Sequence, residues 1–378
     1  MSRVVLLGAG GFTGRLIAAE LARRGHGFVA AGRDARRVRG HLHELPGLDE
    51  VRAFDATDAD SLDRALADAT LVVSSVGPFE RFGRPVLDAA IRAGCHYVDV
   101  TGEQPFVRWA YEERDAAARA AGATVVPGAG FEFVPGDLLA HIASEAVQGA
   151  EEVHVTYLVR GRGLAPATSA GTRRSAATLL GRTGVVRADG VLAEELPGEV
   201  RRLAWFPKPV GPAHAAGIPG AEAITVPRHV PDVRTVRTYL ALPGWQAELL
   251  QSVANAARWD PLRRRLTQLL DVGSDGPGPA RRAATRWACV AESAGDPGVA
   301  RAWAYGTDIY GTTAVIAVAV SEAILAGGTP TGVVPPALLG EPAGILDTLA
   351  ARSDLLWSVD RPDADRAGRD PRGTRPDG

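Results

Sequence analysis

The sequence of 378 residues contains a single lysine, Lys208, although lysine and arginine together number 42. Dehydrogenases that activate a hydroxyl through a Tyr-x-x-x-Lys pair need a lysine four residues after a tyrosine, and Lys208 follows no tyrosine at that spacing. The short-chain dehydrogenase mechanism is therefore excluded. The same scarcity argues against chemistry through a lysine Schiff base.

Cysteine is almost as rare, with Cys95 and Cys289 only. Neither lies in a metal-ligand spacing, and two thiols do not make a disulfide framework. We expect both to be reduced, and Cys95 to be a small packing residue rather than a nucleophile. The eight histidines show no H-E-x-x-H spacing, and no G-x-S-x-G motif is present, so neither a metal site nor a serine hydrolase is predicted.

Long hydrophobic runs and a strong net charge are also missing. The most apolar stretch, residues 312–326, is too short to cross a bilayer and contains Glu322, so we expect a buried helix there. The N-terminus has no signal-peptide pattern, which predicts a cytoplasmic protein without a membrane span. A formal charge of -2 gives no reason to expect nucleic acid as a partner.

Alternating strand and helix patterns fill the first part of the chain. The predicted strands are residues 4–7, 28–31, 51–54, 71–74, 97–100 and 124–126, and the predicted helices are residues 13–24, 61–67 (capped by Ser61), 85–93 (with Pro85 in the first turn) and 105–121. Repeated β–α alternation predicts an α/β fold, a Rossmann-type doubly wound parallel sheet with helices on both faces.

The pattern changes after residue 137. Residues 138–146 look helical, residues 153–159 and 235–241 alternate as half-buried strands do, and glycine and proline are frequent between them. We therefore expect a dinucleotide-binding domain over residues 1–137 and a second α+β domain with a mostly antiparallel sheet over 138–305. Residues 271–279 are predicted to form a loop, and residues 358–378 a disordered tail.

A glycine-rich loop follows the first predicted strand. It reads Gly8-Ala9-Gly10-Gly11-Phe12-Thr13-Gly14, which fits G-x-x-G-x-x-G rather than G-x-G-x-x-G. Glycines allow the tight turn and let backbone N–H groups approach a pyrophosphate, while the helix N-terminus favours its negative charge. Because a strand precedes the loop and a helix and second strand follow it, we predict dinucleotide binding.

The end of the second strand indicates which dinucleotide binds. An acidic residue there would bind the ribose 2′-OH of NAD, but this chain has Gly32-Arg33. Arg33 can hold a 2′-phosphate and stack on adenine, so NADP(H) is preferred. Asp34, one residue later, leaves NAD(H) open. Asp55, after the third strand, is placed either to contact the adenine or to cap a loop.

Six segments together resemble the saccharopine dehydrogenase-like oxidoreductases, which include the trans-acting enoyl reductases. They are GAGGFTG (8–14), AGR (31–33), SVGPF (75–79), GCHYVDVTGE (94–103), VPGAGFE (126–132) and PGDL (135–138), with weaker similarity at YGTTA (310–314) and GVVPPA (332–337). The resemblance covers the first 140 residues well and the remainder thinly. Glu132 departs from the Asp expected after Gly-Phe.

The resemblance implies an NADP(H)-dependent oxidoreductase that adds hydride to an activated C=C, C=O or C=N bond of a small-molecule or carrier-bound acyl substrate. It also implies that residues 306–357 return to the nucleotide domain and place Tyr310 and residues 330–336 beside the cofactor. A homodimer stays open.

Ligands of a doubly wound sheet bind beyond the carboxyl ends of its strands. Ser75, Val76, Gly77 and Pro78 are therefore expected to line the nicotinamide ribose, or else to form a structural turn. Three residues at the fifth strand are the candidate catalytic groups: Tyr97, Asp99 and Glu103. The alternatives are that Asp99 satisfies buried N–H groups, that Glu103 caps the helix after Pro105, and that Tyr97 is a core residue.

Two other functions stay open at this stage. A dinucleotide-binding sensor or scaffold without turnover would explain why no clear acid–base pair is visible. A saccharopine-type amino-acid dehydrogenase would need arginines to hold substrate carboxylates, and Arg160, Arg162, Arg173 and Arg174 are available.

Overall fold

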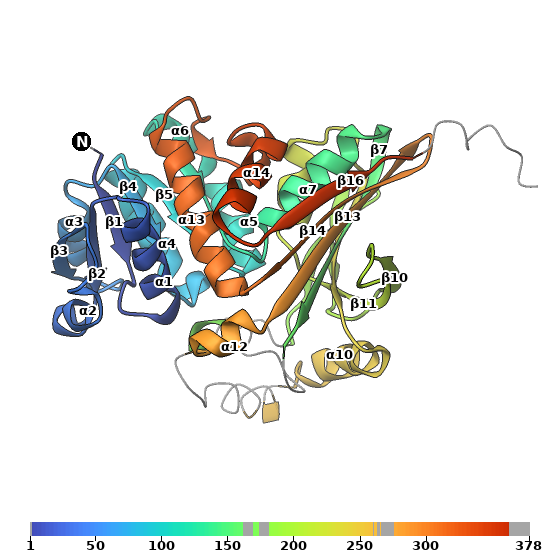
Figure 1. Ribbon diagram of the computed structural model, residues 1–378, viewed down its shortest axis with the longest axis horizontal. Coiled ribbons are helices and arrows are strands. Elements are labelled where there is room, and N and C mark those ends of the chain that lie inside the picture. The colour runs from blue at the N-terminus through green and yellow to red at the C-terminus, as the bar shows by residue number, and fades with distance from the viewer. Residues whose placement is uncertain are drawn as a thin grey trace, which may run out of the picture.

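A parallel sheet of seven strands makes up the N-terminal part of the protein (Figure 1). The computed structural model describes residues 2–161, 169–173, 181–259, 261–262, 265 and 276–362. The strands are β1 (Val4–Leu7), β2 (Phe28–Gly32), β3 (Leu48–Ala53), β4 (Leu71–Ser74), β5 (His96–Asp99), β6 (Thr124–Val126) and β15 (Gly332–Val333). Their order, β15-β6-β5-β4-β1-β2-β3, places the reversal of strand order between β1 and β4, where such sheets bind ligands.

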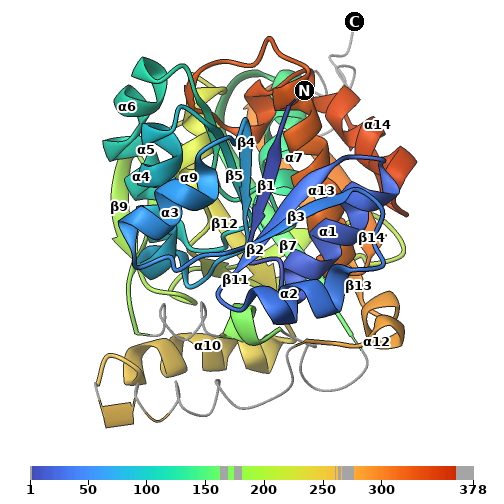
Figure 2. The same ribbon diagram turned by 90° about the vertical axis from the view of Figure 1, so that its left-hand side faces the viewer.

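Helices cover both faces of this sheet (Figure 2). They are α1 (Phe12–Arg23), α2 (Ala35–Leu42), α3 (Ala59–Leu66), α4 (Phe79–Arg92), α5 (Gln104–Glu113) and α6 (Asp115–Ala120). The strands are apolar at consecutive positions because both faces are covered. Val4 and Leu6 pack on the side of α1, whereas Val5 and Leu7 pack on the side of α3 and α4.

A second sheet of nine strands is antiparallel except where β7 pairs with β12. Its strands are β7 (Gln148–Arg160), β8 (Gly184–Ala188), β9 (Val191–Glu195), β10 (Arg201–Trp205), β11 (Pro212–Ile218), β12 (Thr235–Ala241), β13 (Arg286–Asp296), β14 (Val299–Thr307) and β16 (Leu356–Asp360). Short helices α9 (Glu222–Thr225), η1 (Val226–Arg228) and α12 (Pro279–Ala283) and the longer α10 (Gly244–Ala256) accompany it. The predicted combination of a parallel sheet and a mostly antiparallel one is confirmed.

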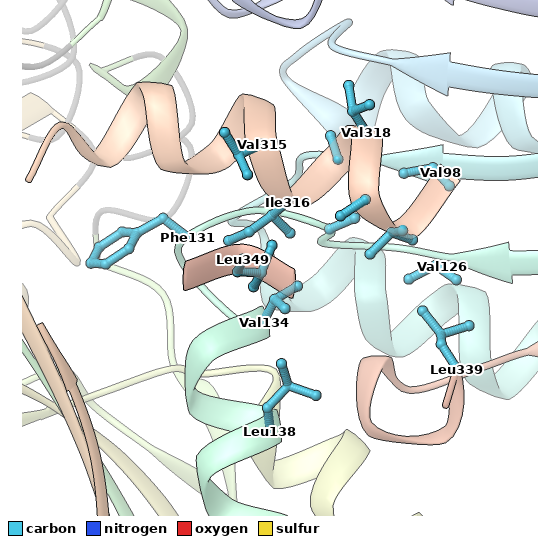
Figure 3. Close-up of a cluster of buried hydrophobic side chains, with 14 of the residues drawn as sticks. Val98, Val126, Phe131, Val134, Leu138, Val315, Ile316, Val318, Leu339 and Leu349 are labelled. Atoms are coloured by element: carbon cyan, nitrogen blue, oxygen red, sulfur yellow. The ribbon is translucent and has the colours of Figure 1, made fainter. Parts of the chain in front are cut away.

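The two sheets share one core, which is built by helices lying between them. These are α7 (Val134–Glu145), α13 (Ile309–Leu325), α14 (Pro342–Arg352) and the short η2 (Pro336–Leu338). Figure 3 shows Val98 and Val126 of the parallel sheet packed close to side chains of α7, α13 and α14. The C-terminal segment therefore contributes to both halves: α13 packs on α1 and β15 pairs with β6, while β16 pairs with β14. The predicted domain boundaries themselves stay predictions.

Several predicted elements differ from the observed ones. Helix α2 was not predicted, and residues 105–121 form two helices, α5 and α6, separated at Arg114. Helix α4 begins at Phe79, so Pro85 lies inside it. Asp58 rather than Ser61 caps α3, because the Ser61 hydroxyl instead accepts the Asp55 N–H.

The C-terminal prediction also needs correction. Residues 358–360 belong to β16 and are not a disordered tail, whereas residues 363–378 lie outside the described part, as do residues 271–275 of the predicted loop. The helix predicted at 312–326 is α13, which is buried. In the described residues no helix is long and apolar enough to cross a bilayer.

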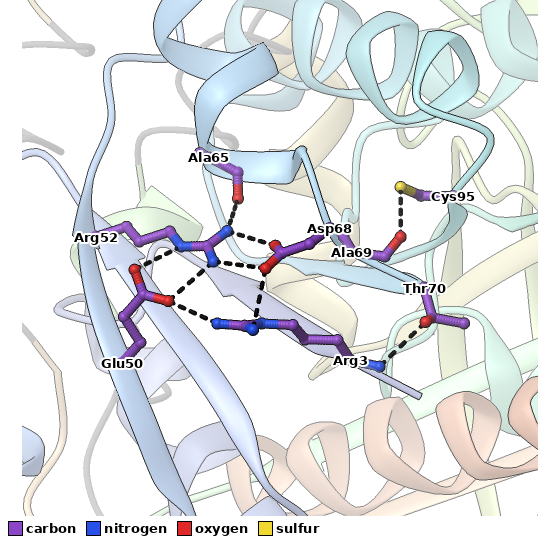
Figure 4. A network of polar contacts seen from close by, with 8 residues as sticks. All are labelled: Arg3, Glu50, Arg52, Ala65, Asp68, Ala69, Thr70 and Cys95. Atoms are coloured by element: carbon purple, nitrogen blue, oxygen red, sulfur yellow. Dashed lines mark hydrogen bonds and ion pairs between the residues drawn. The ribbon is translucent and has the colours of Figure 1, made fainter. Parts of the chain in front are cut away.

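A network of charged side chains links β3 to the segments that precede β1 and β4 (Figure 4). Arg52 of β3 binds Glu50 and Asp68 at 2.8–3.0 Å and donates to the Ala65 carbonyl. Arg3 also reaches both carboxylates. The arginines hold the pKa of Glu50 and of Asp68 below their usual values.

The Arg52→Gln variant is expected to lose about 1 kcal/mol of stability at pH 7, because the ion pairs are partly exposed. Lowered folded-state pKa values contribute stability above the unfolded pKa of about 4 and lose it as the pH falls further. The difference from wild type should therefore shrink by pH 3, as measured by urea unfolding. Arg92→Gln, which removes one exposed pair with Asp63, is the control and should cost about half as much or less.

Candidate functional site

The glycine-rich loop turns sharply between β1 and α1. Gly8 has a φ of +78°, a conformation that side chains rarely adopt, and its N–H and that of Ala9 both donate to the Ala31 carbonyl of β2. Gly14 lies in the first turn of α1, where a Cβ would come within 2.2 Å of the Gly8 carbonyl oxygen. The loop and helix are thus in direct backbone contact, which only glycine permits.

The N-terminus of α1 faces the space beyond the strand ends. Gly11 is its N-cap, and the N–H groups of Phe12, Thr13 and Gly14 have no acceptor within the helix. The first turn carries no acidic side chain, so nothing there competes for an anion. Such a terminus suits a pyrophosphate.

Arg33 and Asp55 follow the next two strands, β2 and β3. Arg33 is exposed, and it forms no hydrogen bond or ion pair within the described part of the chain. Asp34 accepts the N–H groups of Arg36 and Arg37 as the cap of α2, which leaves Arg33 as the charged group at the strand end. Asp55 accepts both the N–H and the hydroxyl of Thr57, and these bonds, with a smaller effect of Arg33, lower its pKa.

Ser75 joins the end of β4 to the glycine loop. Its hydroxyl donates to the Leu7 carbonyl at 3.1 Å and lies 3.3 Å from that of Gly8. A Cβ on Gly8 would meet this hydroxyl at 2.7 Å. Val76, Gly77 and Pro78 continue from there to α4, with Pro78 as the N-cap. The structure therefore brings together the segments predicted to bind the phosphates and the ribose, at the point between β1 and β4 where the strand order reverses. The contacts of these segments with a cofactor stay predictions.

Asp99 and Tyr97 lie at the end of β5 and are both fully buried. Asp99 accepts the N–H groups of Thr101 and Gly128 at 2.8 and 2.9 Å, which ties the loops after β5 and β6 together. Burial raises the pKa of Asp99 to about 7 despite these bonds. Tyr97 packs among the core residues beneath α4 and α5. The alternatives in which Asp99 satisfies backbone groups and Tyr97 is a core residue match this geometry.

Glu103 is also fully buried, and both its oxygens have backbone partners. They accept the N–H groups of Phe79 and Glu80 at 2.9 and 2.8 Å. Glu103 thus satisfies the first turn of α4. It is also the N-cap residue of α5, the helix that contains Pro105, but only its backbone carbonyl, and not its side chain, accepts hydrogen bonds there. A catalytic role for any of these three residues stays a prediction.

Glu132 is a candidate site residue that the sequence-based choice of catalytic groups did not include. It lies in the loop between β6 and α7, at the same sheet edge as Asp99. Its side chain packs against Gly102 and Gly130, where a Cβ would come within 3.4 Å and 3.2 Å of it. Asp99 is the last residue of β5, whereas Glu132 stands six residues beyond the end of β6, so choosing polar residues at strand ends does not find it.

Tyr310, at the start of α13, is the late residue that reaches the loop. Its ring packs edge-on against Phe12 at 5.0 Å, and its hydroxyl accepts the Ser169 N–H. Tyr310 therefore lies next to the glycine loop, while its expected place beside the cofactor stays a prediction. Residues 330–336 are different: they run along β15, which is four strands from β1, roughly 19 Å away. They border the loop after β6 rather than the glycine loop.

Metal ligation finds no support in the described residues, which contain no cluster of three suitable side chains. The glycine loop instead fits a dinucleotide. Gly8 and Gly14 form a cradle that a Cβ would fill, the α1 N-terminus supplies donors, and Arg33 supplies a positive charge at the second strand.

Comparison with known proteins agrees with this geometry. Residues 4–126 match the family model of the saccharopine dehydrogenase NADP binding domain. A Mycobacterium tuberculosis protein named for trans-acting enoyl reductase activity is 38% identical over 165 residues, 41% of this chain and 39% of its own length. The trans-acting enoyl reductase of Mycobacterium ulcerans is 33% identical over 163 residues, with the same coverage. The chain thus matches about two fifths of the length of these curated relatives.

Two solved structures share the fold along nearly the whole chain. Saccharopine dehydrogenase (L-Glu forming) from Saccharomyces cerevisiae has a TM-score of 0.62 and 14% identity, covering 95% of this chain and 99% of that one. Homospermidine synthase from Legionella pneumophila, solved in complex with NAD, has a TM-score of 0.60 and 12% identity, covering 96% and 92%. Residues 4–126 are therefore similar to the NADP binding domain of saccharopine dehydrogenase, and the chain as a whole shares the fold of these two structures.

Proposed function

We propose that this protein is an NADPH-dependent reductase that adds hydride to an activated double bond of an acyl or related metabolite. The observation that carries the proposal is the glycine cradle at the α1 N-terminus, with exposed Arg33 at the end of β2. The likeness to trans-acting enoyl reductases supports an α,β-unsaturated acyl thioester as the first acceptor to test. Carbonyl and imine acceptors belong to the same panel.

Bound NADPH would supply the hydride, so the protein's own residues have to bind, orient and shield. The N–H groups of Phe12, Thr13 and Gly14 would hold the pyrophosphate, and Arg33 the 2′-phosphate. Ser75 would keep the β4 loop against the glycine loop on the nicotinamide side. The core beneath β4 and β5 keeps this edge of the sheet rigid, which hydride transfer requires.

The Arg33→Ala variant is expected to bind NADPH about 10- to 100-fold more weakly, because it loses charged contacts to the 2′-phosphate worth about 1.5–3 kcal/mol. Affinity for NADH should change by about threefold or less, since NADH lacks that phosphate. Fluorescence titration of both cofactors measures the difference. Arg39→Ala, an exposed arginine further along α2, is the matched control. Equal losses for NADPH and NADH would contradict the assignment.

Turnover is tested by following NADPH oxidation with crotonyl-CoA and then with the carbonyl and imine acceptors. Tight NADPH binding without oxidation by any acceptor would overturn the proposed reductase and leave a non-catalytic dinucleotide-binding protein. Consumption of NADPH with one acceptor class identifies the reaction.

A further inference from the structure

Glu132 differs from the buried carboxylates elsewhere in the protein. Asp99, Glu103, Asp137 and Glu222 have no exposed surface, and each accepts at least two hydrogen bonds from the protein. Glu132 is only partly buried, and its carboxyl has no ion pair and no side-chain partner among the described residues; the one hydrogen bond that affects its pKa comes from its own backbone N–H. A carboxyl kept only for stability would normally be paired, because desolvation without partners is costly.

The surroundings hold Glu132 in one place without neutralising it. The neighbouring Phe131 is anchored on both sides: its N–H donates to the Thr313 hydroxyl of α13, and its ring packs edge-on against Tyr157 and Trp287. Gly102 and Gly130 leave the space that the Glu132 carboxyl occupies. Rigid neighbours and an unpaired acid are typical of a reacting group rather than of a packing residue.

The location of Glu132 is at the nicotinamide side of the sheet. The glycine loop and Arg33 occupy the ends of β1 and β2, which fixes the adenosine half of a dinucleotide on that side. The reactive half then extends past β4 toward β5 and β6. Glu132 lies in the loop that leads from β6 to α7, on the side where the acceptor has to lie.

We propose that Glu132 is the proton donor of the reduction, an inference that rests on the proposed reductase function. Hydride from NADPH forms a new C–H bond and moves the π electrons of the acceptor onto its other atom. That electron pair takes the proton of the Glu132 carboxyl, which leaves Glu132 as a carboxylate and the cofactor as NADP⁺. A proton from water then restores the acid. Burial raises the pKa of Glu132, which keeps more of the proton-bearing form available near neutral pH.

The first test is the Glu132→Gln variant, which keeps the shape and removes the acidic proton. We expect kcat with crotonyl-CoA to fall on the order of 100-fold or more, while NADPH affinity and melting temperature stay within error. The wild-type kcat should fall as the pH rises through the Glu132 pKa. The kcat of the variant should not show this decrease with pH. Glu132→Asp should recover part of the rate. Glu145→Gln, at the exposed end of α7, is the matched control.

The second test measures the protonation state of the Glu132 carboxyl directly and needs no substrate. Infrared difference spectra between wild type and Glu132→Gln, recorded with NADPH bound from pH 4 to 8, show the carboxyl stretch of Glu132 alone. Loss of its proton only above the usual glutamate range supports the proposal. Titration at or below that range, or unchanged kcat in Glu132→Gln, overturns it. Wild type that oxidises no NADPH with any acceptor refutes the reductase function instead, and the spectra then still decide whether Glu132 holds a proton.

Discussion

Replacing Gly14 by alanine is expected to weaken NADPH binding on the order of 100-fold and to destabilise the N-terminal domain by about 1–3 kcal/mol. The added Cβ would stand 2.2 Å from the Gly8 carbonyl oxygen and 2.9 Å from the Ala9 Cα. Both obstacles are backbone atoms, so α1 has to move away from the loop. That movement misplaces the N–H groups of the first turn, and each charge-assisted hydrogen bond lost costs about 1.5–3 kcal/mol.

Calorimetric titration with NADPH and thermal unfolding measure the two effects separately. Gly40→Ala is the matched control, because Gly40 lies on exposed α2, where a Cβ meets nothing within 4 Å. It should bind NADPH normally and be no less stable than wild type, since alanine favours a helix. Normal NADPH affinity in Gly14→Ala would show that the cofactor does not use this helix terminus.

The Glu103→Ala variant is expected to lose about 3 kcal/mol or more of stability, the largest loss among the single substitutions considered. It would leave the buried N–H groups of Phe79 and Glu80 without an acceptor, at about 1–3 kcal/mol for each donor, and would open a cavity as well. The loop of residues 75–78 leads into the same helix turn, so NADPH affinity should fall together with stability.

Chemical unfolding of Glu103→Gln and Glu112→Ala completes the comparison. Glutamine keeps one acceptor and the side-chain volume, so its loss should be clearly smaller than that of alanine. Glu112 is an exposed residue of α5 that pairs with Arg108 at the surface, and its replacement should cost about 0.5 kcal/mol. If Glu103→Ala were as stable as wild type, the capping role would be refuted. A variant of unchanged stability that still lost turnover would return Glu103 to the catalytic candidates.

Features encoded within a few consecutive residues were predictable. The alternation of apolar strands with amphipathic helices depends on neighbours in the chain, and β1, β4, β6 and β12 were predicted with their observed bounds. The glycine spacing is local in the same sense, because one turn and one helix end determine where backbone N–H groups point. Arg33 was found for the same reason, since it is the residue directly after β2.

Helix boundaries that depend on distant partners were predicted less well. Pro85 looked like the first turn of a helix, but the chain is already helical at Phe79 because Glu103, from another loop, accepts the first N–H groups. Ser61 resembled a cap until its hydroxyl was seen to bind the Asp55 N–H. In both cases a hydrogen bond across the fold changed the local preference.

The sequence by itself determined the parallel sheet, the dinucleotide loop and the preference for NADP(H), because each depends on residues close together in the chain. Only the tertiary structure decided which carboxylates accept hydrogen bonds from backbone N–H groups of other residues. Asp99 and Glu103 are bound to backbone N–H groups of other residues, whereas the Glu132 carboxyl has only its own backbone N–H as a partner in the described part of the chain. The physical reason is that a carboxylate's role depends on the donors that surround it, and those donors come from loops far apart in the sequence.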